Sequence, residues 1–298
     1  MPKGQNMTVV VANRILHDFY DKSNPSEEDE FLFTEALKYL IEETKNPDCM
    51  TQLGGFYYEK RNYDLALKYY EMAAEYNHLP AIIGLGYIWY YGRTGERNYE
   101  KAFYYYDRAR QLGDPVAAYK VADMYKNGYF VEKNYDKYKE IIEDLYPKVR
   151  RARSLGDPLP EVFTRLAKIR SEEGKPQEAL QLYDVARDFL AQRIRVNPFF
   201  GNLNIMKWMI EDIYKLRPFN RDIFDLYDLY YLLTAPVKVR FSCYGEEHEV
   251  EGVREDGGIA VRFDEKWFRT ADDFFQKAER DGELLTSIYE DMYDFEVL

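Results

Sequence analysis

An interval of 36 residues recurs in the first half of the chain and limits the architectures that the chain can adopt. The dipeptide Asn-Tyr, followed each time by an acidic residue, begins at Asn62, Asn98 and Asn134. Small residues keep the same step in four further columns, which are Ala73 and Ala109, Ala81 and Ala117, Gly86 and Ala122, and Gly92 and Gly128. A fixed period of about 20 to 50 residues is typical of repeat proteins, in which each unit buries its apolar face against its neighbours. The sequence therefore predicts a stack of equivalent units.

Each repeat is predicted to be a pair of helices. The first helix, near residues 80–91 in one copy, ends at Gly92, because glycine adopts the left-handed C-cap conformation without strain. The second helix begins behind Asn98, whose side-chain oxygen can accept hydrogen bonds from the amides of the first helical turn, and it runs to Gly113. Small residues on both helices allow their axes to approach closely. This pattern predicts a mainly α fold, an α-solenoid of stacked helix pairs.

The spacing of these residues resembles the Sel1-like repeat. The residues that carry the resemblance are Ala81, Gly84, Leu85, Gly86, Trp89 and Gly92, followed by Asn98, Tyr99, Glu100, Lys101, Ala102, Tyr106, Ala109 and Gly113. The next copy departs from the pattern at Tyr138, which stands where the preceding copy has alanine, and this predicts a distorted helix pair. We also expect Pro147 to interrupt the helical extension that follows.

The resemblance extends over residues 48–195 if two less regular units are included. The earlier of these runs from Leu53 to Ala74. A fourth unit, over residues 156–186, has the shorter turn of a tetratricopeptide-like repeat. The resemblance implies a curved scaffold that is used for protein contacts. Helical periodicity at residues 8–20 and 28–44, and again at 198–216 and 220–234, predicts helices that cap the two ends of the stack.

A small α+β domain is predicted for residues 236–298. It follows a solenoid that, with its capping helices, occupies residues 1–235. Apolar and polar residues alternate from Val237 to Cys243, as expected of a half-buried strand. A second strand is expected near residues 247–254, and Asp256-Gly257 is a strong hairpin signal before a third strand. The sequence thus predicts a three-stranded antiparallel meander.

One or two helices are expected to cover this meander. Thr270 and Asp273 resemble a capping pair for a helix that runs through Ala278, and Gly282 is predicted to end that helix. The last segment then follows from residue 283.

The charge of the chain argues against a nucleic-acid partner. The formal net charge is −12, and residues 236–298 alone hold 8 Lys and Arg against 17 Asp and Glu. Phosphates attract Lys and Arg, which this chain does not have in excess. The acidic excess either keeps the surface soluble or forms a docking face for a basic partner. An alternative function is therefore an acidic inhibitor that mimics nucleic acid and blocks a nuclease or a defence complex.

The cysteines and the hydropathy pattern favour a cytoplasmic location. Cys49 and Cys243 are far apart and form no disulfide framework, so both are expected to be free thiols in a reducing compartment. The N-terminus shows no signal-peptide pattern, and no apolar run approaches the roughly 20 residues that span a bilayer. Either Met1 or Met7 can be the start of the chain.

No convergent set of catalytic groups is visible in the sequence. His17, His78 and His248 lie in different segments, and none has metal-ligand spacing with another ligand, so neither a metal nor a cofactor is expected. Cys243 and His248 are close in sequence, but residues of unlike parity in a hairpin are expected to face opposite sides. We therefore predict that the chain is not an enzyme. An enzyme built on the C-terminal module, with His248 and Cys243 in one pocket, stays open as a third hypothesis.

The 29 tyrosines suggest where a protein or peptide partner binds. Trp89, Tyr106 and Tyr125 stand at packing positions of the repeat and are assigned to the core. Other side chains on the first helices lie away from that packing face, where solenoids present their inner surface, and tyrosine is frequent at binding hot spots. The predicted partner-binding residues are Tyr58, Tyr87, Tyr90, Tyr91, Asp123 and Lys126. The leading hypothesis is a scaffold that binds its partner on the concave face of the repeats.

Overall fold

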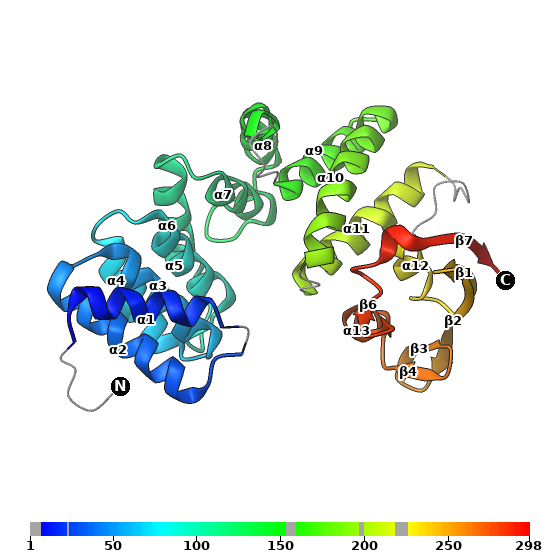
Figure 1. The fold of residues 1–298 in the computed structure, drawn as a ribbon. Helices are drawn as coiled ribbons and strands as arrows, with labels where there is room; N and C mark the ends of the chain where they lie inside the picture. Colours follow the sequence, from blue (N-terminus) through cyan, green and yellow to red (C-terminus); the bar gives the residue numbers. More distant parts are fainter. Residues whose placement is uncertain (1–6, 23, 153–158, 197–199, 218–225) are drawn as a thin grey trace. The chain divides into compact units, whose positions relative to one another are not determined.

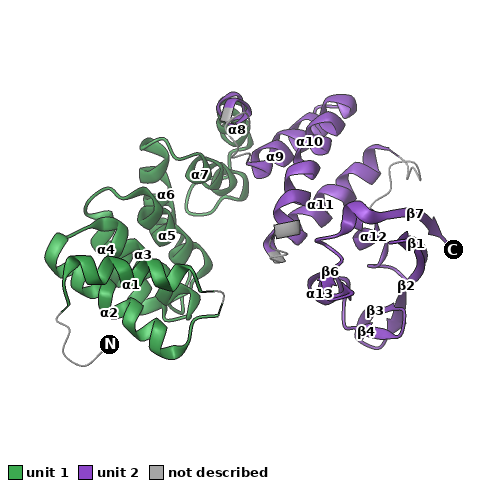
Figure 2. Cartoon of the chain, viewed as in Figure 1, with its two compact units in different colours: residues 1–145 green, residues 146–298 purple. Residues whose placement is uncertain are grey.

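The computed structural model describes residues 7–22, 24–152, 159–196, 200–217 and 226–298. Two compact units divide these residues, the first ending at Leu145 and the second beginning at Tyr146 (Figure 2). The predicted boundary between residues 235 and 236 lies inside the second unit and stays a prediction.

The first unit is built from helices that pack against one another in chain order (Figure 1). Its helices are α1 (Val9–Tyr20), α2 (Glu27–Thr44), α3 (Pro47–Glu59), α4 (Tyr63–Ala74), α5 (Leu79–Tyr91), α6 (Tyr99–Gln111), α7 (Pro115–Asn127) and the first part of α8 (Tyr135–Ala152). Close packing continues without a break from α1 to α7. The predicted helices at residues 8–20 and 28–44 are confirmed as α1 and α2.

The three asparagines of the 36-residue interval occupy equivalent places in successive helix pairs. Their Oδ1 atoms accept hydrogen bonds from the backbone N–H groups of Leu65, Lys101 and Lys137, over 3.3, 2.9 and 2.8 Å respectively. Their own backbone N–H groups donate to the carbonyls of Tyr57, Trp89 and Tyr125, over 2.8, 3.0 and 2.8 Å. Each asparagine therefore starts the second helix of a pair and ties it to the first, as the interval predicts.

Glycine and tyrosine interlock where the helices cross. Tyr70 on α4 lies between Gly54 on α3 and Gly84 on α5, and a Cβ atom on either glycine would come within 2.7 Å of its ring. Tyr106 on α6 lies against Gly86 in the same way and is fully buried. The large ring thus fills the space that the absent glycine side chain leaves open.

The third helix pair is less closely packed than the first two, as predicted from its departing sequence. Helix α8 does not pack as closely on α7 as α6 does on α5. The reason lies at one position, where Ala66 and Ala102 in the first two pairs are replaced by the buried Tyr138. A tyrosine ring at the contact keeps the helix axes further apart.

The prediction for Pro147 is wrong. Helix α8 continues through this residue to Ala152. Proline removes one backbone donor and kinks a helix, but the flanking turns can continue when their other hydrogen bonds are kept.

Four helices open the second unit after the end of α8. They are α9 (Pro160–Glu172), α10 (Pro176–Val196), α11 (Phe200–Leu216) and α12 (Leu226–Leu232). Helices α9 and α10 pack as a hairpin, and Gly174 in their short turn has a φ of 73°. This pair is the helix hairpin expected of the fourth repeat, whose first residues, 156–158, lie outside the described residues. Likewise, α11 and α12 correspond to the predicted capping helices, and residues 220–225 lie outside the described part.

An antiparallel sheet follows the helices of the second unit. Its five strands are β1 (Lys238–Cys243), β2 (Glu246–Glu255), β3 (Gly258–Phe263), β4 (Lys266–Phe268) and β7 (Met292–Val297), in the order β4-β3-β2-β1-β7. The predicted meander is confirmed as β1 to β3. Two strands that the sequence did not indicate, β4 and β7, extend it at its two edges (Figure 1).

Helix α13 (Ala271–Lys277) covers the sheet through aromatic contacts. The ring of Phe274 lies 5.6 Å from that of Phe263 and 5.4 Å from that of Phe268. Thr270 caps the helix, as predicted, by accepting a hydrogen bond from the backbone N–H of Asp273 over 3.1 Å. Gly282 does not end it, because the helix stops at Lys277 and Gly282 instead forms the turn between β5 (Glu279–Arg280) and β6 (Glu283–Leu284).

Candidate partner-binding site

The six residues predicted to contact a partner lie on, or at the end of, the first helix of successive pairs. Tyr58, Tyr90 and Lys126 each stand eleven residues beyond the first residue of α3, α5 and α7. Tyr87 and Asp123 each stand eight residues beyond it. The helix-pair geometry therefore places these side chains at equivalent positions along the stack, as their spacing predicts.

Lysine and tyrosine side chains from neighbouring helices meet around Lys120 of α7. Its ammonium nitrogen lies 5.1 Å from the ring centroid of Tyr87 and 5.9 Å from that of Tyr91. These two rings, one helical turn apart on α5, stack on each other with centroids 6.0 Å apart. Tyr91 keeps 41% of its surface exposed, so a rigid aromatic face beside a cation reaches the solvent.

Tyr90 contributes more to the scaffold than to the open surface. Its ring contacts those of Tyr99 and Tyr129, with centroids 5.6 and 6.0 Å away. Burial raises the pKa of its hydroxyl well above the ordinary value, and the nearby charge of Asp123 raises that pKa further. Tyr90 therefore stays neutral and holds its hydroxyl near the carboxylate of Asp123.

Arg93 joins the tyrosines of two successive pairs. Its Nε atom donates a hydrogen bond to the hydroxyl of Tyr58 over 3.1 Å. Its guanidinium carbon lies 5.9, 5.8 and 5.3 Å from the ring centroids of Tyr58, Tyr63 and Tyr91. Neither Arg93 nor Lys120 was among the residues predicted from the sequence. A signal was available for Arg93, which directly follows the predicted C-cap Gly92 and so has a fixed direction relative to the helix.

These side chains form what we call the tyrosine-cation surface. It comprises Tyr58, Tyr87, Tyr90, Tyr91, Arg93, Lys120, Asp123 and Lys126. Lys126 takes part through its ammonium nitrogen, 4.8 Å from the ring centroid of Tyr138. Tyrosine offers a large rigid contact area with a polar tip, and cations held over aromatic rings need little further ordering when a partner arrives. The surface thus combines aromatic contact area with cations in fixed positions.

The residues assigned to the repeat core fall into two groups. Tyr106 is fully buried, whereas Trp89 and Tyr125 are partly buried and pack against the core of the first unit. Lys101 covers the Trp89 ring from outside, with its ammonium nitrogen 3.9 Å from the ring centroid.

His78 takes part in a polar contact that resembles part of a catalytic triad. Its Nδ1 atom lies 2.8 Å from Thr51 Oγ1, and its Nε2 atom lies 2.9 Å from Asp48 Oδ1. In a hydrolytic triad the carboxylate is buried behind the imidazole, whereas the Asp48 side chain is 67% exposed. The contact ties the residue before α5 to the first turns of α3, which is a structural role.

The prediction that Cys243 and His248 face opposite sides of the hairpin is wrong. The two-residue turn between β1 and β2 pairs Cys243 with Glu246 and Phe241 with His248, so residues of unlike parity share a face. Both Cys243 and His248 are buried on that face. His248 Nδ1 hydrogen-bonds with Asp264 Oδ2 over 3.1 Å, and its ring lies 5.5 Å from that of Phe241. Burial raises the pKa of the Cys243 thiol, which disfavours the reactive thiolate.

Carboxylates of the C-terminal sheet are engaged with basic side chains. Glu249 pairs with Lys238 over 2.5 Å and with Arg240 over 3.3 Å, and Glu251 pairs with Arg262 over 2.6 Å. Carboxylates held in this way are less available to imitate the phosphates of a nucleic acid.

The described residues show neither a metal-binding cluster nor a membrane-spanning helix. Among them, no three His, Cys, Asp or Glu side chains gather as they would to hold a metal ion. Over the same part of the chain, no helix combines the length and the apolar character needed to cross a membrane.

Comparison with known proteins identifies the helix pairs. The family model of the Sel1 repeat matches residues 47–78, 79–114 and 115–137, which are the segments that begin at α3, α5 and α7. Residues 47–137 match the Sel1 repeat. Sel1 repeats generally serve as scaffolds for protein-protein interaction, and their fold is typically non-enzymatic.

Solved structures with the same kind of fold are distant in sequence. The Sel1 repeat protein from Oxalobacter formigenes is 22% identical, with a TM-score of 0.51 over 71% of this chain and 78% of that one. A protective antigen present in uropathogenic Escherichia coli strains is 18% identical, with a TM-score of 0.49 over 69% of this chain and 46% of that one. No curated protein matches the chain. The likeness to the Oxalobacter protein therefore establishes the fold alone.

Proposed function

We propose that the chain is a scaffold that binds a protein or peptide partner through the tyrosine-cation surface, on the concave face of its Sel1 repeats. One observation carries the proposal: Tyr58, Tyr90 and Lys126 occupy equivalent positions on the first helices of successive pairs, and cations lie over the neighbouring tyrosine rings. Tyrosine and arginine are the residue types most often found at binding hot spots. Because neighbouring rings and helices already hold these side chains, little conformational entropy is lost on binding.

The residues of the surface differ in how much they contribute to packing, and this difference determines which substitution tests the proposal. Substitution of Tyr90 would remove contacts with Tyr99 and Tyr129 and so disturb the scaffold itself. Tyr91 is a sharper target, because 41% of its surface is exposed. Tyr104 provides a matched control, since it is another exposed tyrosine, with 59% of its surface accessible, but lies on the second helix α6.

The experiment is an affinity capture from a native lysate with the full chain as bait, followed by mass identification of the retained protein. We expect Tyr91→Ser to reduce the amount of one defined partner about tenfold, as loss of a hot-spot tyrosine does. Tyr104→Ser should retain the partner, and both variants should unfold at the same urea concentration as the parent. Equal capture by Tyr91→Ser and the parent, or equal loss in both variants, would contradict the proposal.

A further inference from the structure

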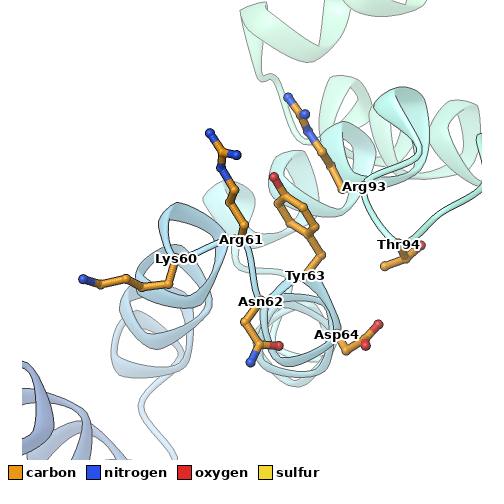
Figure 3. A pocket seen from close by; sticks show the side chains of 7 residues that line it. All are labelled: Lys60, Arg61, Asn62, Tyr63, Asp64, Arg93 and Thr94. Atoms are coloured by element: carbon orange, nitrogen blue, oxygen red, sulfur yellow. The ribbon is translucent and has the colours of Figure 1, made fainter.

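A basic pocket lies beside the tyrosine-cation surface, where the turn between α3 and α4 meets the loop that follows α5. The cavity has a volume of about 370 Å³. Its lining includes Arg61, Tyr63, Asp64, Arg93 and Thr94 (Figure 3). Such a concentration of arginine is unexpected in a chain with a net charge of −12.

Neither arginine of the pocket is neutralised by the part of the chain that the structure describes. Many basic side chains among the described residues form an ion pair with a carboxylate, as Lys60 at the rim of the pocket does with Glu30. Arg61 and Arg93, by contrast, form no ion pair with any described carboxylate. Figure 3 shows their side chains rising on either side of the Tyr63 ring, and Asp64 pointing away from both guanidinium groups.

Comparison with the next repeat shows that packing does not require a cation at position 93. The equivalent residue is Tyr129, since Arg93 and Tyr129 each follow a left-handed glycine C-cap. Tyr129 stacks flat on Tyr99, with centroids 4.4 Å apart, just as Arg93 covers Tyr63. The tyrosine that follows the N-cap asparagine is thus covered by a neutral ring in one repeat and by a guanidinium in the other.

The guanidinium of Arg93 keeps its charge and part of its hydrogen-bonding edge for a ligand. Its face lies over the tyrosine rings, and its Nε atom donates to Tyr58. The terminal nitrogens donate no hydrogen bond to the residues that the structure describes. A guanidinium in this state matches the planar geometry of a carboxylate, which accepts two parallel N–H groups.

Arg61 is positioned by an unusual backbone. Its φ is 59°, in the left-handed region that a residue other than glycine or asparagine adopts only at a cost. Its backbone N–H donates to the carbonyl of Tyr58 over 3.0 Å, which fixes the turn from which its side chain extends.

We propose that Arg61 and Arg93 bind a carboxylate of an acidic segment of the partner. This inference rests on the proposed function and names the chemistry that the partner presents next to Tyr58 and Tyr91. A carboxylate suits the pocket because its two oxygens can accept parallel N–H groups from one guanidinium. The negative charge of the whole chain does not prevent binding, because physiological salt screens the interaction between exposed charges that are more than about 8 Å apart.

The test uses the full chain labelled with ¹⁵N-arginine and two end-capped probe peptides, hexaglutamate and hexaglutamine. The Nε–H group of Arg93 is held by Tyr58, so its NMR signal should be protected from exchange with water. We expect hexaglutamate to shift this signal in a saturable way and hexaglutamine to leave it in place. Arg110, which is paired with Asp107 over 2.6 Å, serves as the internal control.

Two variants separate charge from packing. Arg93→Tyr restores the residue type of the next repeat and should keep the unfolding midpoint, while it weakens hexaglutamate binding at least tenfold. Arg61→Asn removes the second cation and tolerates the left-handed backbone, and it should also weaken binding. Equal binding of both peptides, unchanged affinity in Arg93→Tyr, or tighter binding of inorganic phosphate than of hexaglutamate would overturn the inference. If hexaglutamate fails to bind while Tyr91→Ser still impairs capture, the inference is wrong and the proposed function stands.

Discussion

At the scale of single residues, the solenoid depends on glycines that leave room for tyrosine rings. Tyr70 fits between Gly54 and Gly84, so both glycines are set by packing and not by backbone conformation. The 36-residue interval predicted close helix contacts from such small residues, but it did not show which ring each glycine faces. Which ring faces a glycine depends on residues that are distant in the sequence and close in the folded chain.

Alanine in place of Gly54 should destabilise the protein although alanine is the better helix former. A Cβ atom there would lie 2.6 Å from the Tyr70 ring, and overpacking of this kind costs roughly 1–3 kcal/mol. The adjacent Gly55 is the matched control in the same helix, because a Cβ atom there meets only the Tyr70 hydroxyl at 3.7 Å. Urea unfolding should show a loss for Gly54→Ala and no loss for Gly55→Ala. Equal effects of the two substitutions would show that the ring is not confined.

The stability of the first unit should fall at alkaline pH through Tyr70. Burial raises the pKa of Tyr70 to about 12, whereas the hydroxyl in the unfolded chain titrates near its ordinary value of 10.0. The raised pKa stabilises the folded state fully below pH ~10, and this contribution is lost as the pH rises from about 10 to about 12. It amounts to about 3 kcal/mol. Unfolding measured against pH should show a smaller alkaline loss for Tyr70→Phe than for the parent, and identical curves would contradict the assignment.

The candidate site was only partly predictable at this scale. Tyr58, Tyr87 and Tyr91 could be chosen from their positions on the first helices. Arg93 could be placed from the C-cap glycine before it, but the rings that Arg93 and Lys120 contact could not, because Tyr58 and Tyr87 belong to other helices. Helical periodicity indicates which face a residue occupies, but not which side chains from other helices reach it.

At the scale of helices and strands, the local signals in the sequence were reliable where regular structure was unbroken. The asparagine N-caps, the glycine C-caps and the first three strands could all be predicted. Strand β7 could not, because a bulge interrupts its alternation: between the pairs Ser242 with Tyr293 and Arg240 with Glu296, one residue of β1 faces two of β7. A period-two pattern is lost wherever such an extra residue is inserted.

The N-cap of α6 should contribute measurably to stability. Asn98 Oδ1 accepts a hydrogen bond from the Lys101 amide over 2.9 Å, and removing such a cap costs about 1 kcal/mol. Asn98→Ala should therefore lower the free energy of unfolding by this amount, whereas Asn98→Asp keeps the acceptor and should be nearly neutral. Thermal unfolding that ranks the aspartate variant with the alanine variant would argue against the capping role.

The bulge in β7 should reveal itself through Asp294. This residue has a φ of 55°, which glycine adopts freely and a β-branched residue adopts only at a cost of about 1–2 kcal/mol. We expect Asp294→Gly to keep or slightly increase the unfolding midpoint and Asp294→Val to lower it. A valine variant as stable as the parent would show that β7 is regular.

At the scale of the whole molecule, the repeat period predicted the solenoid, and the third helix pair shows where the regular packing ends. Tyr138 replaces the alanine of the earlier copies, and α8 then packs less closely on α7. The sequence could flag this departure, but the division into units at Leu145 and Tyr146 follows from contacts that no local pattern records.

We propose that the first helices of successive pairs present the partner-binding surface. Hydrogen exchange of the full chain, measured with and without the captured partner, tests this claim most directly. Binding should slow exchange in peptides that cover residues 87–94 and 119–127, and leave α4 and α6 unchanged. Protection confined to α4 and α6, or to the strands of residues 238–297, with unaltered exchange at 87–94, would contradict it.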